Sequence, residues 1–247
     1  MITRRGLIVG CGASFALPGI CRCQTYYGCT LTASEIATET NNKKTMEFSY
    51  VDGQAPVATS GDKDFDYALA QTLNYLSNLF DVLPGFTYLD DAKGKNAYAS
   101  PANYMGRSDG TVLFGLRFLQ EFLNQPAYPA AYIAAVCAHE FGHIAQYKYG
   151  IDDRLGGQPT VKRIELHADF LAGYFAGRRK LDNANFPAAV IAQAQFSVGD
   201  HAVDHPGHHG TPDERGNAVK AGFLASYHRR LMFKDALEAG VDYVKTL

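Results

Sequence analysis

The stretch AAVCAHEFGHIAQYKYG, residues 134–150, lies in a segment whose pattern is typical of one helix, from about residue 129 to 149. His139 and His143 are four residues apart, so their imidazoles project from the same side of that helix, one turn apart. This spacing allows both rings to bind a single zinc ion. Glu140 points about 100° around the helix from His139, where it can reach a water on the metal without acting as a ligand. The motif therefore predicts a zinc site with its catalytic base already in place.

A catalytic zinc site usually has three protein ligands and an open position for water. The next candidates stand in ELHAD, residues 165–169, in a second segment of helical pattern. Glu165 and Asp169 are four residues apart and share a face, whereas His167 points about 200° away from Glu165. We prefer Glu165 as the third ligand, because Asp169 can then accept the free N–H of a ligating histidine, His139 in our interpretation. His167 is expected to be a surface or packing residue.

Hydrophobic spacing and turn residues place these segments in a helix-dominated α+β domain that we assign to residues 62–247. The first helix is expected at 62–80 with Asp62 as its N-cap, and the second metal-bearing helix at about 160–180 with Thr160 as its N-cap. The best strand candidate is 111–114. Further helices are expected at 116–123, 187–196 and after 212, with loops at 150–160 and 199–211.

Composition excludes several classes of function. The chain has 247 residues, of which 47% are hydrophobic and 19% charged, enough apolar material for a packed core. Its formal net charge is −2 and no long basic stretch occurs, so nucleic acid is not an expected partner. No apolar run approaches the roughly 20 residues that a spanning helix needs, so we expect no transmembrane segment in the mature protein.

The N-terminal residues have the pattern of an export leader. Arg4 and Arg5 precede a short apolar run, which resembles a twin-arginine (Tat) signal. We assign 1–30 to this leader and 31–61 to a partly disordered linker, and we expect a periplasmic or cell-envelope location in a bacterium. Residues 8–11 resemble a lipobox, which makes Cys11 a candidate for a lipid anchor; the alternative is an ordinary cytosolic N-terminus.

Cys137, in the zinc helix, is expected to be a buried structural thiol.

AHEFGH followed by ELHADFLAG resembles the gluzincin metallopeptidases, specifically the M48-like peptidases and the bacterial putative neutral zinc metallopeptidases. The resemblance implies a zincin-like fold with a small β-sheet or edge hairpin beside the active-site helix. It also implies one Zn²⁺ per chain, with Glu165 as the third ligand and Asp169 as the orienting carboxylate.

Two further segments extend this resemblance. NAYASPANYMGRSDGTVLFG, residues 96–115, is similar to the strand that precedes the zinc helix in that family, so we expect an extended substrate to pair with Asn96, Ala97 and Tyr98. HHGTPDER, residues 208–215, matches the family segment with a His and an Arg. His209 is thereby a candidate donor to the developing oxyanion, and Arg215 is expected to pair with a carboxylate near the site.

The resulting hypothesis is a zinc metalloendopeptidase that hydrolyses peptide bonds of peptide or protein substrates, with Glu140 as the base that assists attack by a zinc-bound water. Two alternatives stay open from the sequence. One is a catalytically silent zinc-binding envelope protein that acts as a binding or assembly partner. The other is a helical domain without metal that carries the motif by coincidence.

Overall fold

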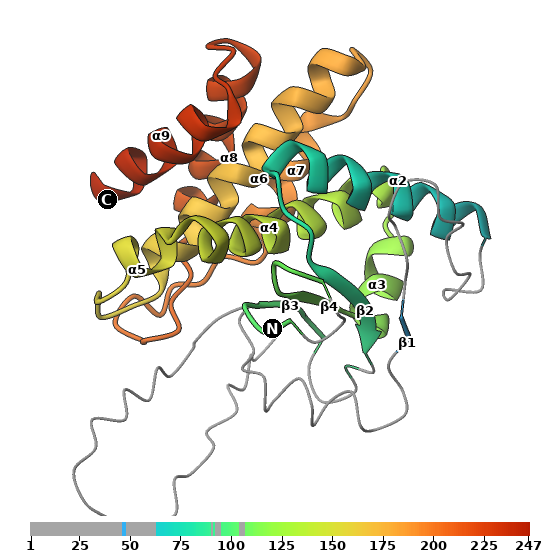
Figure 1. The fold of residues 1–247 in the computed structure, drawn as a ribbon, viewed down its shortest axis with the longest axis horizontal. Helices are drawn as coiled ribbons and strands as arrows, with labels where there is room; N and C mark the ends of the chain where they lie inside the picture. The colour runs from blue at the N-terminus through green and yellow to red at the C-terminus, as the bar shows by residue number, and fades with distance from the viewer. Residues whose placement is uncertain (1–45, 48–62, 90, 92–94, 104–106) are drawn as a thin grey trace, which may run out of the picture.

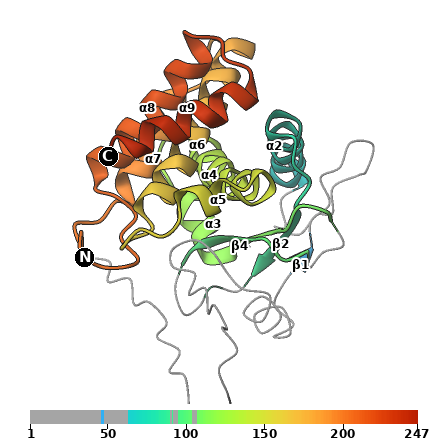
Figure 2. The ribbon, with the colours of Figure 1, turned by 60° about the vertical axis from the view of Figure 1, so that its left-hand side comes forward.

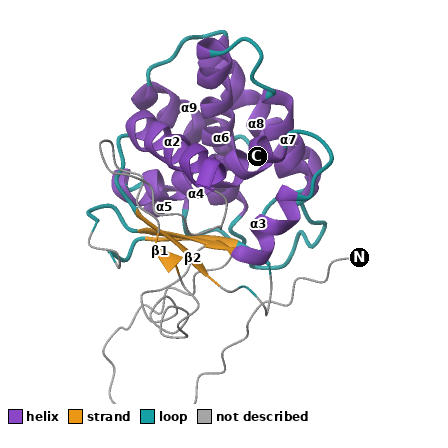
Figure 3. Ribbon diagram, turned by 90° about the vertical axis from the view of Figure 1, so that its right-hand side faces the viewer, coloured by secondary structure: helices purple, strands orange, loops and turns teal. Residues whose placement is uncertain are grey.

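The computed structural model describes residues 46–47, 63–89, 91, 95–103 and 107–247. The leader assigned to 1–30 and most of the linker at 31–61 lie outside the described residues. A group of helices packs over one face of a small sheet, as the side view in Figure 3 shows. The prediction of a helix-dominated α+β domain is confirmed.

The sheet has four strands in the order β1-β2-β4-β3. These are β1 (Met46–Glu47), β2 (Gly85–Leu89), β3 (Ala97–Ser100) and β4 (Thr111–Gly115). β2 and β4 run parallel, whereas β1 and β3 are antiparallel to their neighbours. The predicted strand at 111–114 is confirmed as β4, with one residue more. β3 lies at an edge of the sheet, and among the described residues its outer side pairs with no strand.

The helices of the described chain are α2 (Lys63–Phe80), α3 (Leu116–Leu123), α4 (Pro129–Tyr149), α5 (Ile151–Leu155), α6 (Lys162–Asp182), α7 (Ala188–Ser197), α8 (Pro212–Tyr227) and α9 (Phe233–Lys245). α4 passes through the middle of the molecule, with the sheet and α3 on one side and α6, α8 and α9 on the other (Figures 1 and 2). None of the helices in this part of the chain combines the length and apolarity that a membrane crossing demands.

The two central helices are buried on every side for much of their length. All side chains of α4 from 133 to 146 are buried, and so are those of α6 from 165 to 177. A helix that is buried all round normally carries apolar residues throughout. The polar side chains of these two stretches therefore lie in the interior, where each needs a partner for its charge or its hydrogen bonds.

Two predicted boundaries are wrong. Residues 150–160 were expected to form a loop, but 151–155 make the short helix α5, because Gly150 turns the chain at φ 63° and the side chains of Ile151 and Leu155 reach the core. α6 begins at Lys162, and its N-cap position is Val161, without a side-chain cap. Thr160, the expected N-cap, accepts only a long hydrogen bond of 3.4 Å from the Lys162 amide.

Candidate metal centre

The site forms where α4 and α6 come closest. Gly142 of α4 faces Ala168 of α6 so tightly that a Cβ on Gly142 would lie 3.1 Å from the Ala168 Cα. His139 and His143 flank this glycine on α4, and Glu165 lies one turn before Ala168 on α6. The small residues at the crossing therefore bring the three polar side chains together.

His139, His143 and Glu165 direct their side chains at one point. The two Nε2 atoms are 3.1 Å apart, the His139 Nε2 is 3.2 Å from Glu165 Oε2, and the His143 Nε2 is 3.6 Å from Glu165 Oε1. All three residues are buried, with at most 2% of any of them exposed. Among the described residues they are the group that could hold a metal ion.

The hydrogen bonds at the Nδ1 atoms of His139 and His143 show which nitrogen of each ring carries a proton. His139 Nδ1 lies 2.8 Å from Asp169 Oδ1, and a carboxylate can only accept, so the ring donates from Nδ1; in the neutral imidazole Nε2 then carries a bare lone pair. His143 Nδ1 lies 2.8 Å from the side-chain oxygen of Gln146, which places its proton on Nδ1 in the same way. Glu165 Oε2 accepts no hydrogen bond from any described residue. With both rings neutral, three electron-pair donors converge at one point.

These residues fit a metal ion. Ligands bound tetrahedrally at about 2.0–2.1 Å lie about 3.3 Å apart, close to the separations found here. Burial would raise the pKa of Glu165, but positive charge on the imidazoles of His209 and His143 outweighs it and holds the pKa well below its usual value. A metal ion bound between neutral imidazoles would supply positive charge at the same place and keep the carboxyl group ionised, as a ligand must be. Two imidazoles and one carboxylate suit several transition metals, so the donors alone do not choose among them.

Asp169 connects the His139 ring to α8. Its carboxylate receives two bonds from the Arg215 guanidinium, from Nε at 2.8 Å and from Nη2 at 2.9 Å, and Nη2 also donates to the side-chain oxygen of Gln195 at 2.9 Å. Burial would raise the pKa of Asp169, but Arg215 and His139 outweigh it and lower the pKa. Asp169 is the carboxylate partner that was expected for Arg215.

The start of α8 holds Arg215 in place. Thr211 and Glu214 form a capping box, in which the Thr211 hydroxyl accepts from the Glu214 amide at 3.3 Å and the Glu214 carboxylate accepts from the Thr211 amide at 2.9 Å. Arg215 follows in the first turn, so the cap fixes where its side chain leaves the helix.

Compared with known proteins, this chain matches no family model, no curated protein and no solved structure. Its function is therefore inferred from the geometry and chemistry of the site.

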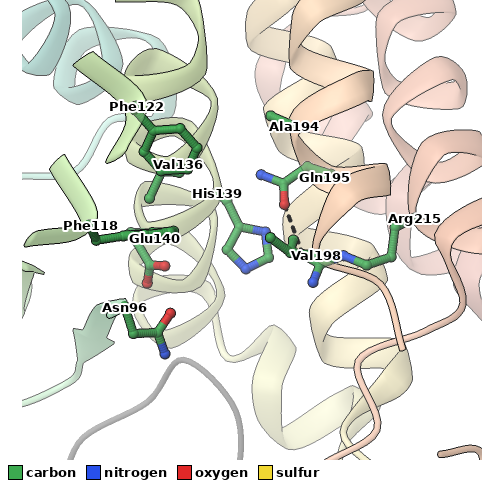
Figure 4. Close-up of a pocket in the computed structure, with 10 residues that line it drawn as sticks. All are labelled: Asn96, Phe118, Phe122, Val136, His139, Glu140, Ala194, Gln195, Val198 and Arg215. Atoms are coloured by element: carbon green, nitrogen blue, oxygen red, sulfur yellow. Dashed lines mark hydrogen bonds between the residues drawn. The ribbon is translucent and has the colours of Figure 1, made fainter. Parts of the chain in front are cut away.

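Glu140 is buried beside a small pocket next to the metal ligands. The pocket is lined mainly by apolar side chains, together with His139, Arg215, Gln195 and Asn96. Figure 4 shows the Glu140 carboxylate and the Asn96 amide on the same side of this pocket, with the His139 ring across from them. The apolar part of the lining comes from Phe118, Phe122, Val136, Ala194 and Val198.

The residues expected to bind substrate lie next to this pocket. Ala97 is buried and pairs with Phe114 of β4, while Asn96 and Tyr98 are partly exposed. The strand β3 packs against α4, and its outer edge has no strand partner among the described residues.

His209 is held at the edge of the site by the loop before α8. Its backbone N–H donates to Asp200 Oδ2 at 3.1 Å, and its ring Nδ1 is 3.5 Å from the same oxygen. His208 binds the other carboxylate oxygen of Asp200 through Nδ1 at 2.6 Å. Of the other histidines in this loop, His208 is buried, whereas His201 and His205 are exposed.

Sequence reasoning missed the part that Gln146, His167 and Gln195 play around the site. His167 is a fully buried packing residue, and burial lowers its pKa to about 4. Gln146 lies three residues after His143, a helical spacing that places it next to the same face and could have suggested the contact. Nothing local to Gln195 indicates that it meets Arg215, since they belong to different helices.

Cys137 is buried as expected, and its burial raises the pKa of the thiol.

Proposed function

We propose that this protein is a zinc-dependent metalloendopeptidase. The observation that supports the proposal is the convergence of His139, His143 and Glu165, with bare electron pairs, beside the buried carboxylate of Glu140. A zinc ion held by these three ligands would lower the pKa of a bound water towards about 7 and polarise the carbonyl of the scissile bond.

Glu140 supplies the proton transfer in this proposal. It is on the helix that carries both histidines, and it lines the neighbouring pocket, where its carboxylate lies on the same side as the Asn96 amide (Figure 4). From there the carboxylate accepts the proton of the attacking water and passes it to the leaving amine nitrogen. A purely structural metal site has no need for a second carboxylate in this position, which favours hydrolysis over a silent binding protein.

The surroundings suit an extended peptide. The outer edge of β3 has no strand partner among the described residues, and the substrate is proposed to lie along Asn96, Ala97 and Tyr98 beside the pocket that contains Glu140. The Asn96 carbonyl already accepts from the Gly115 amide, so in the antiparallel alternation it is the main chain of Ala97 that faces outward. A substrate that adds to this edge is recognised through its backbone. His209, on the opposite loop, donates to the oxygen that becomes negative as the carbonyl is attacked.

The substitution Glu140→Gln tests the proposal. It should leave about one zinc per chain, because Glu140 is not a ligand. Cleavage of casein should fall by about 10²–10⁴-fold, because the proton acceptor is lost. Zinc is measured by elemental analysis and cleavage by release of labelled peptides. Glu121→Gln is the matched control, since Glu121 lies on the surface of α3, where it pairs with Lys95.

The outcomes separate the hypotheses. A native protein that binds zinc but cleaves nothing would support the silent envelope protein, and a folded protein that binds no metal would support the coincidental motif. Undiminished turnover in Glu140→Gln would remove Glu140 from its assigned role.

We further propose that the protein is exported to the bacterial periplasm or cell envelope, on the basis of the leader sequence. A reporter fused after residue 61 should be exported, and Arg4→Lys with Arg5→Lys should block that export because twin-arginine signals depend on the pair. Export that is unaffected by the double substitution would reject a twin-arginine leader.

A further inference from the structure

A chain of buried hydrogen bonds leads from His143 away from the metal centre to the C-terminal helix. His143 Nδ1 is 2.8 Å from Gln146 Oε1. Gln146 Nε2 is 2.7 Å from the Ile164 carbonyl oxygen and 3.1 Å from His167 Nδ1. His167 Nε2 is 3.1 Å from the carbonyl oxygen of Leu237, on α9. The side chains of His143, Gln146 and His167 are all fully buried.

The two carbonyl groups decide the direction of every bond in this chain. A carbonyl oxygen only accepts, so the Gln146 amide must turn its NH₂ group to Ile164, and its oxygen then faces His143. His143 therefore donates from Nδ1 and keeps Nε2 bare. His167 must donate from Nε2 to Leu237, which leaves its Nδ1 to accept from Gln146. No other tautomer of either histidine satisfies all four contacts.

Helix α9 packs closely against His167, which lies at the far end of this chain of hydrogen bonds. Gly240 lies against the His167 ring, where an added Cβ would be 2.9 Å from Cδ2 and 3.0 Å from Nε2. Such distances are shorter than normal van der Waals contact, so a side chain here has to displace the ring or the helix. The position of α9 thus fixes the position of His167.

We infer that Gln146 and His167 are positioning residues for the metal, which hold His143 in its Nδ1–H form and connect the metal centre to the packing of α9. The inference rests on the metal-binding part of the proposed function and is independent of peptidase activity. The Asp169 carboxylate orients His139, whereas the Gln146 side-chain amide orients His143, so the two ligands are oriented by different means. Loss of such a partner typically weakens metal binding about 10–100-fold.

Zinc affinity of the full-length, metal-free protein tests this inference, measured by competition with a chromophoric chelator. Gln146→Met, which keeps the length of the side chain but neither donates nor accepts, should weaken zinc binding about 10–100-fold. His167→Leu should weaken it less, because the Ile164 carbonyl still holds the amide. His167→Gln should restore part of that loss, since its amide can accept from Gln146 and donate to Leu237. Gly240→Ala, which touches no ligand, should also weaken binding.

Two controls distinguish positioning from loss of stability. Leu73→Ala removes a buried side chain of α2, a helix that contributes no ligand and no member of the chain, and it should lower the free energy of unfolding without changing zinc affinity. Urea unfolding of each metal-free variant shows how far its fold is weakened. Gln146→Met with native zinc affinity, or His167→Leu and Gly240→Ala both at native affinity, would overturn the inference.

The tautomers give a readout that needs no activity. Long-range ¹⁵N NMR of the zinc-loaded protein should show His143 protonated on Nδ1 and His167 on Nε2. The opposite tautomer at His167 would break the chain even if zinc binds. If the native protein binds no zinc, the proposed function fails. If it binds zinc and the variants bind equally well, only the positioning role fails.

Discussion

At the level of single residues, the interior of this protein holds charges that are stable only because each has a specific partner. Asp169 is fully buried and Arg215 is 2% exposed, yet the guanidinium and the carboxylate meet through two short hydrogen bonds. Moving such ions out of water is costly, and only close pairing offsets that cost. The same carboxylate is hydrogen-bonded to His139, so stability and the orientation of a candidate metal ligand depend on one side chain.

Arg215→Met should destabilise the metal-free protein by about 3–5 kcal/mol, because it leaves the Asp169 charge buried without its cation. Arg154→Met should have a far smaller effect, since the pair between Arg154 and Glu238 lies at the surface. Urea unfolding measures the free energy of unfolding of both variants. Equal losses for the two variants would contradict the view that the buried pair is special.

Asp200 provides a pH-dependent contribution to stability. Burial would raise its pKa, but hydrogen bonds from His208 and from the amides of His209 and Ala202 outweigh it and lower the pKa to about 2. A carboxyl group with a lowered pKa stabilises the fold above its unfolded value of about 3.9. That contribution is lost as the pH falls through the folded pKa. The free-energy difference between the native protein and Asp200→Asn should therefore shrink between about pH 4 and pH 2. A difference that stays constant over this range, measured by urea unfolding, would show that Asp200 is not the group responsible.

At the level of the helices, α6 and α8 lie so close that their backbones touch. A Cβ on Gly173 of α6 would lie 1.9 Å from the Val219 carbonyl oxygen, and one on Gly222 of α8 would lie 1.8 Å from that of Phe170. No side chain larger than hydrogen fits at either position. This approach lets Arg215 on α8 reach Asp169 on α6.

Gly173→Ala should destabilise the protein by about 1–3 kcal/mol or more, because the helices must separate to admit the methyl group. Gly216→Ala, also within a helix, is the matched control. Its Cβ would have its nearest neighbour at 3.6 Å, an ordinary contact, so the higher helix propensity of alanine should stabilise the protein by about 0.5–1 kcal/mol. Thermal and urea unfolding compare the stabilities of the Gly173→Ala and Gly216→Ala variants. A native-like stability for Gly173→Ala would mean that the helix contact is looser than the structure shows.

At the level of the whole molecule, the candidate metal site lies between α4 and α6 at the centre of the fold. Because the unfolded chain does not hold the three ligands together, zinc should stabilise the folded protein by mass action. At a free zinc concentration about 100 times the dissociation constant, the gain is about 2.7 kcal/mol. The midpoint of thermal unfolding should rise with added zinc and fall with a chelator, and Glu165→Ala should abolish the response. No response in the native protein would argue against a metal site.

Local patterns predicted much of the fold and the core of the candidate site. α4 begins and ends at the expected residues, because Pro129 suits the first turn of a helix and Gly150 adopts the positive φ that ends one. Helical spacing placed His139 and His143 on one face. It also favoured Glu165 over His167, and in the structure Glu165 faces the histidines while His167 packs against α9.

The sequence by itself thus determined which residues share a helix face, since helix geometry repeats every 3.6 residues whatever surrounds it. Only the tertiary structure decided which faces meet. The Asp169–Arg215–Gln195 contacts and the chain from His143 to Leu237 join residues of different helices, which local periodicity treats separately. The physical reason for these contacts is long-range packing: the close glycine contact between α6 and α8, and the packing of Gly240 of α9 against the His167 ring, bring together groups far apart in sequence.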